Sequence, residues 1–131
     1  RKRHPVFRRS RFLSGMDTNH DNHPDLSWHG IEVGKPDWSE EAGVLAFMLD
    51  GSELGEGQWD DDFYVILNGD SVERNFQIPQ PREGTMWSRL VDTGKPSPQD
   101  ILDEGKGEAT AVERAYSMLP GSASVFISRK P

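Results

Sequence analysis

The stretch DFYVILNGDSVERNFQIPQPREGTMWSRLVDTG, residues 62–94, decides the fold because strand-like runs alternate in it with turn residues. Residues 63–67 and 86–91 have the length and the β-branched and aromatic content of strands. The pair Asn68-Gly69 predicts a turn, since both residues tolerate a positive φ. Pro79 cannot donate a backbone hydrogen bond, so we expect it to end the strand before it.

The flanking sequence extends the same pattern in both directions. The apolar run VLAFML, residues 44–49, predicts one more strand, and residues 124–127 predict the last. The segment ATAVERAYSM, residues 109–118, fits either a helix or a strand, although the Pro120-Gly121 turn after it favours strands. Five or six strands without strand-helix alternation predict an all-β fold, an antiparallel β-sandwich of Greek-key-like topology.

Composition limits the classes of function. The 131 residues fit one domain, and the absence of cysteine excludes a disulfide framework. We expect no membrane partner, because no apolar run approaches the length that spans a bilayer. The net charge is −7, with six basic residues within the first eleven positions and all 22 acidic residues after residue 16. We expect this acidic body to repel phosphate backbones, which argues against nucleic-acid binding.

Three polar motifs suggest metal chemistry, and each has a simpler interpretation. Residues 17–22, DTNHDN, begin like a calcium loop but lack its glycine and its terminal glutamate. His20, His23 and His29 are enough for zinc, but no helical or strand periodicity holds them on one side. Residues 60–62 are three aspartates, which we interpret as a solvated run before a hydrophobic strand. We therefore expect neither a metal site nor a cofactor.

Tryptophans are the remaining candidates for binding. Trp87 lies in a predicted strand and is expected to pack in the core. Trp28 and Trp38 lie in a polar, turn-rich stretch, where an indole ring can stack on a sugar or fill an interface. No nucleophile elbow or glycine-rich phosphate loop is present in the sequence. The residues alone thus identify no catalytic group.

An ordered set of motifs carries a family resemblance. The set comprises RKRHPVF at residues 1–7, DLSWHG at 25–30, PDWS at 36–39 and WSRLVDTGKP at 87–96. Their order and spacing resemble the C-terminal region of isoamylase-type glycogen and starch debranching enzymes, of the α-amylase clan. The resemblance implies a β-sandwich that follows a catalytic (β/α)₈ barrel, which cleaves α-1,6 branch linkages in glucans.

The resemblance also implies a division of the chain. Residues 1–12 would be a helix remnant, the end of the barrel's last helix. Residues 13–43 would be a long loop that packs towards the barrel, and residues 44–131 the sandwich.

Under this interpretation the catalytic carboxylates lie in the barrel, so this chain contains none and is inactive alone. Trp28, His29 and Trp38 are candidates for carbohydrate or interdomain contact. The partners would be the barrel and, through it, an α-glucan. The compartment would be the bacterial cytoplasm or, alternatively, the plastid stroma. Two alternatives to the role as a non-catalytic domain of a debranching enzyme are an autonomous carbohydrate-binding module and a calcium-stabilised domain.

Overall fold

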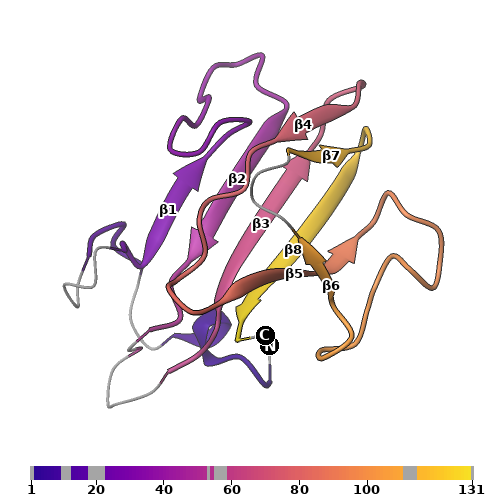
Figure 1. Ribbon diagram of the computed structural model, residues 1–131. Coiled ribbons are helices and arrows are strands. Elements are labelled where there is room, and N and C mark those ends of the chain that lie inside the picture. The colour runs from indigo at the N-terminus through magenta and orange to yellow at the C-terminus, as the bar shows by residue number, and fades with distance from the viewer. Residues whose placement is uncertain are drawn as a thin grey trace.

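In the computed structural model, the helices and strands are almost entirely antiparallel strands, as the sequence predicted (Figure 1). It describes residues 2–9, 13–17, 23–52, 54, 59–110 and 115–130. The elements in chain order are a 3₁₀ turn η1 (Pro5–Arg8) and the strands β1 (Leu26–His29), β2 (Val44–Leu49), β3 (Asp62–Asn68), β4 (Arg74–Phe76), β5 (Met86–Asp92), β6 (Glu108–Thr110), β7 (Tyr116–Met118) and β8 (Ser122–Arg129). Six strands form one sheet in the order β1-β2-β3-β8-β5-β6, and β4 pairs with β7 in a second sheet.

The β4–β7 pair lies across one face of the six-stranded sheet (Figure 1). This covered side is called the inner face here, and it holds the larger core cluster: Ala46, Met48, Tyr64, Ile66, Phe76, Ile78, Trp87, Met118 and Phe126. Trp87 is fully buried, and its indole N–H donates to the Pro79 carbonyl at 2.8 Å. The predicted core role of Trp87 is therefore confirmed.

The strands predicted from the sequence are present, with some changes in length. Strand β2 has the predicted bounds, and β3, β5 and β8 extend beyond theirs by one to four residues. Residues 109–118, left open between helix and strand, contribute β6 and β7, while residues 111–114 lie outside the described part. The count among the described residues is eight strands, because short strands add to the predicted ones: β1 and β6 pair with the longer β2 and β5, and β4 and β7 pair with each other.

The structure adds detail to two parts of the expected layout. The loop expected over residues 13–43 contains β1, which pairs with β2 so that Leu26 lies opposite Leu49 and His29 opposite Ala46. The four residues LSWH alternate apolar and polar, which is strand-like but too short to stand out in a polar stretch. The N-terminal helix remnant is a single 3₁₀ turn with Pro5 at its start. Within the described residues, no helix is long and apolar enough to cross a bilayer.

The turn after β3 was predicted because Asn68 and Gly69 tolerate a positive φ. In the structure, hydrogen bonds of the Asn68 side chain hold it. Asn68 is buried, and its Nδ2 group donates to the carbonyls of Met118 at 3.0 Å and Val72 at 3.2 Å. Its Oδ1 accepts from the Asp70 amide at 3.1 Å. The Asn68 side chain thus ties the end of β3 to the second sheet, so the chain leaves β3 for the other layer without forming a hairpin next to it.

Candidate functional site: the outer face of the sheet

The opposite side of the six-stranded sheet, called the outer face here, is also apolar. Because side chains alternate along a strand, every second residue of β1, β2, β3 and β8 points to it. By register the apolar residues among them are Leu26, Trp28, Leu45, Phe47, Leu49, Phe63, Val65, Leu67, Ala123, Val125 and Ile127, and Arg129 at the end of β8 is the charged one. The turn η1 packs on one end of this face, where Val6 is buried with Leu49, Phe63, Leu90 and Ile127.

Away from η1 the outer face is accessible. Leu67 is 39% exposed, whereas Ile66, the preceding residue on the inner face, is fully buried. Between η1 and the edge of the sheet is a hollow of about 430 Å³, lined by Val6, Phe7, Arg9, Leu13, Leu26, Trp28, Phe47 and Leu49. All but one of these residues are apolar. This end of the sheet therefore offers a contact surface for an apolar partner.

Trp28 and Trp38 meet at the rim of the hollow. Their ring centroids are 5.4 Å apart with an interplanar angle of 76°, and Trp28 also contacts Phe47 with ring centroids 5.7 Å apart. Trp38 is 65% exposed and Trp28 is 41% exposed. Because the two rings are nearly perpendicular, they do not form one flat platform. Through Phe47 they continue the apolar outer face.

His29 does not share this exposure. It is buried, the Gly34 amide donates to its Nδ1 at 2.7 Å, and its Nε2 lies 2.8 Å from Ser27 Oγ. Since Nδ1 accepts, the proton is on Nε2, which donates to Ser27. Burial lowers the pKa of His29, consistent with this neutral ring. His29 therefore fixes the turn that follows β1, and both of its nitrogens are occupied.

Glycine is needed at the end of the same motif. A Cβ on Gly30 would lie 2.6 Å from the Lys35 carbonyl oxygen, closer than any ordinary contact. The sequence DLSWHG thus combines an exposed indole at Trp28 with a buried ring at His29 and a close backbone approach at Gly30. Of the three predicted contact residues, the structure brings Trp28 and Trp38 together and separates His29 from them by burial.

The expected metal motifs are only partly described. Residues 18–22, with most of the calcium-like segment and His20, lie outside the described part of the chain. His29 has no nitrogen lone pair available for zinc in its present hydrogen bonds.

The interpretation of residues 60–62 as a solvated run is wrong. Asp62 is buried and accepts from the Gly51 amide at 2.9 Å and from Arg82 Nε at 3.1 Å. Asp61 accepts from Arg129 Nε at 3.1 Å, and the Asp60 side chain is only 5% exposed. The Asp60 amide also donates to the Gly51 carbonyl at 2.7 Å. Contacts with Gly51, Arg82 and Arg129 thus bind carboxylates that look solvated in the linear sequence.

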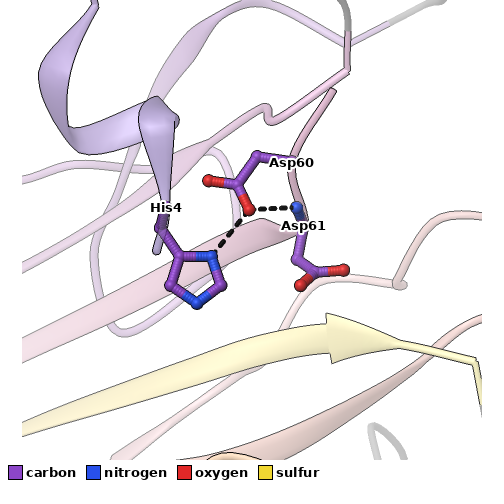
Figure 2. A group of neighbouring side chains, drawn as sticks. All are labelled: His4, Asp60 and Asp61. Carbon is purple, nitrogen blue, oxygen red and sulfur yellow. Dashed lines mark hydrogen bonds and ion pairs between the residues drawn. The ribbon is translucent and has the colours of Figure 1, made fainter. Parts of the chain in front are cut away.

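Asp60 joins a polar cluster at the η1 end of the outer face. Figure 2 shows His4 Nδ1 directed at the Asp60 carboxylate. The distance from His4 Nδ1 to Asp60 Oδ1 is 2.6 Å. The other ring nitrogen of His4 contacts Glu104, which also accepts from Arg129 Nη2 at 2.9 Å. Burial opposes the charged ring, but the hydrogen bonds and charges of Asp60 and Glu104 outweigh burial and raise the pKa of His4.

Sequence reasoning overlooked both the outer face and this cluster. The signal for the outer face was present: VLAFML and FYVIL are apolar at odd and even positions alike, a pattern typical of strands buried on both sides. The cluster left no such signal, because His4 and Glu104 are 100 residues apart.

Comparison with known proteins places these features in a family. The family described as "Isoamylase 1-3, C-terminal" matches residues 27–126. The chain belongs to this family of isoamylase C-terminal domains. The matched range begins within β1 and ends within β8, so it covers most of the six-stranded sheet and both sequence motifs around Trp38 and Trp87.

Individual relatives agree with the family. Isoamylase SU1, chloroplastic, of Zea mays is 39% identical over 79% of this chain, and the isoamylase of Flavobacterium sp. is 35% identical over 96%. Isoamylase 3, chloroplastic, of Oryza sativa subsp. japonica is 32% identical over the whole chain. The chain spans only 13%, 16% and 14% of the lengths of these three relatives. It is thus similar to one part of much longer debranching enzymes.

Proposed function

We propose that this isoamylase C-terminal domain is a non-catalytic part of an enzyme that hydrolyses α-1,6-glucosidic branch linkages in glycogen or starch-like glucans. Its outer face packs against the catalytic (β/α)₈ barrel of the same parent chain, stabilises that barrel and helps to shape substrate binding. Relatives that are much longer than this chain support a partner within one polypeptide. Bacterial and chloroplastic relatives support a bacterial cytoplasm or a plastid stroma as the compartment.

The apolar outer face is the observation that carries this proposal. A sheet that faces water on one side usually alternates apolar and polar residues, whereas β2 and β3 are apolar on both sides. Burying one large apolar side chain contributes about 1.5–3 kcal/mol. Leu67, Trp28 and Trp38 are all more than a third exposed, so covering them would stabilise the assembly.

The geometry of the tryptophan pair favours an interface over a sugar site. A sugar ring stacks on an indole face that is open to solvent, whereas Trp28 already contacts both Trp38 and Phe47 in edge-to-face geometry. Trp28 and Trp38 are at 76° to each other and are continuous with Phe47. We therefore assign both indoles to interdomain contact and His29 to the support of the turn beneath them.

Two variants in two settings test the interface. Leu67→Lys places a charge on the outer face, and Val72→Lys is the matched control because Val72 is 49% exposed in the loop after β3. In the isolated chain we expect both to change the free energy of unfolding by less than about 0.5 kcal/mol. In the parent enzyme we expect only Leu67→Lys to lower the melting temperature. Equal effects of the two variants in the parent enzyme would contradict the interface.

Two assays on the isolated chain separate the other functions. We expect no hydrolysis of a branched α-glucan, and measurable turnover by these 131 residues would overturn the non-catalytic role. We also expect the indole N–H signals of Trp28 and Trp38 to keep their chemical shifts in millimolar maltooligosaccharide. Saturable shifts at Trp38 would favour the autonomous carbohydrate-binding module instead.

A further inference from the structure

The cluster around His4 has a feature that the proposed function does not use. Both ring nitrogens of His4 face carboxylate oxygens: Nδ1 lies 2.6 Å from Asp60 and Nε2 contacts Glu104. An ionised carboxylate only accepts hydrogen bonds, and a neutral imidazole has a single N–H to donate. Only the doubly protonated ring can therefore satisfy both contacts at once.

The same residues hold the N-terminal segment on the sheet. The Val6 amide donates to Asp60 Oδ2 at 3.1 Å, and the Phe7 amide donates to the His4 carbonyl at 3.1 Å. The rings of His4 and Phe7 both pack edge-on against Phe63, with centroids 4.8 Å and 4.6 Å away. Release of the His4 ring would thus remove its two carboxylate contacts and leave the Val6 amide and Arg3 as the polar contacts of this segment.

We propose that His4 is a proton-dependent clasp that holds residues 2–9 against the outer face while its ring is protonated and releases them when the ring becomes neutral. All groups of the clasp lie within this chain, so the proposal does not depend on the proposed function.

The charges that face His4 come from every element packed around it. Asp60 and Asp61 precede β3, Glu104 precedes β6, and Arg129 ends β8. Arg3, on the same segment as His4, lies 3.9 Å from Glu104. Three carboxylates thus face two arginines, and a protonated His4 supplies the third positive charge.

This charge balance favours a proton over a metal ion. His4, Asp60 and Asp61 are close enough to one another to bind a cation. However, Asp60 Oδ1 already accepts from the Asp61 amide at 2.7 Å, and Arg129 already binds Asp61 and Glu104. A divalent ion would have to displace the His4 proton and would leave the cluster with excess positive charge.

The clasp makes a quantitative prediction by linkage. The carboxylates raise the pKa of His4 in the closed state, despite the opposing effect of burial. In the open state His4 should titrate near its ordinary value of about 6.5. The equilibrium constant for closing should then fall as the pH rises from the open-state pKa through the closed-state pKa. The total fall should be about tenfold for each unit by which the closed-state pKa exceeds the open-state pKa.

Nuclear magnetic resonance of the chain tests the clasp. The His4 ring signal, assigned by its loss in His4→Gln, should titrate above the ordinary histidine value, while His29 in the same spectra should titrate below it. Glu104→Gln should lower the His4 pKa. Glu108→Gln is the matched control, because that carboxylate pairs with Arg89 instead, and it should leave the His4 pKa unchanged.

Amide exchange reports whether the ring holds the segment. The protection of the Val6 amide, corrected for intrinsic exchange, should fall as His4 loses its proton and should be independent of pH in His4→Gln. A His4 pKa at or below the ordinary value, or the same pH dependence in both proteins, would overturn the proposal. Stoichiometric Zn²⁺ binding that His4→Gln abolishes would overturn it in favour of a metal site.

Discussion

The two faces of the six-stranded sheet have nearly the same chemistry but different surroundings. On β3, Tyr64 and Ile66 are fully buried on the inner face, where β4 and β7 cover them. Val65 and Leu67, on the outer face of the same strand, are only partly buried or exposed. The comparison shows that the residue type prepares a surface for burial, whereas the rest of the fold decides which surface is covered within the chain.

The largest expected loss of stability comes from a substitution at the centre of the inner face. Trp87→Ala removes a fully buried ring that also donates to the Pro79 carbonyl. We expect the free energy of unfolding to fall by about 3–5 kcal/mol, because the substitution leaves a large cavity. Denaturant unfolding measures the loss. A loss below about 1 kcal/mol would mean that the inner face is not the core of the chain.

Adjacent residues of β3 allow a direct comparison of the two faces. Ile66→Ala should cost about 2–5 kcal/mol, the range for a buried aliphatic side chain. Leu67→Ala should cost less than about 1 kcal/mol in the isolated chain, since the side chain is already 39% exposed. Denaturant unfolding of both variants gives the difference. Equal losses would show that the outer face is covered within the chain.

An intermediate effect is expected where the edge strand β1 begins. Asp25 is buried and accepts from the Ser14 amide at 2.9 Å and the Gly15 amide at 2.7 Å. Burial alone would raise its pKa, but these hydrogen bonds outweigh burial and lower it. Asp25→Asn should cost about 1–2 kcal/mol at neutral pH, because the amide is a weaker acceptor.

The sign of the pH dependence follows from the lowered pKa of Asp25. Its contribution is fully present above the unfolded-state value of about 3.9 and is lost as the pH falls through the lower folded-state value. The gap in stability between the wild-type chain and Asp25→Asn should therefore narrow in acid. Urea unfolding at neutral and acidic pH measures this gap, and a constant gap would exclude the carboxylate as the stabilising group.

The smallest expected effect is at the rim of the outer face. Trp38→Ala should change the stability of the isolated chain by only about 0.5 kcal/mol, because the ring is 65% exposed and touches Trp28 by its edge. The same substitution should lower the melting temperature of the parent enzyme if the ring lies in an interface. No change in the parent would remove Trp38 from the interface and would leave Trp28 to be tested alone.

Sequence reasoning succeeded where the signal was local. The run at residues 44–49 gave β2 with its bounds, and the position of Trp87 in a strand identified a core residue. It failed where a feature depended on distant partners. Asp62 looks solvated beside two other aspartates, but Gly51 and Arg82 bind it in the fold. Strand β1 was overlooked because it exists by pairing with β2.

By itself the sequence determined the all-β class, most of the strands and the family, because periodicity, turn residues and motif order are properties of neighbouring positions. Only the tertiary structure decided which apolar face is covered, that His29 is buried beside exposed Trp28, and that His4 meets Asp60 and Glu104. The physical reason is that burial and charge pairing arise between residues that are distant in the sequence. The alternating pattern of a strand specifies two faces but not what lies against either one.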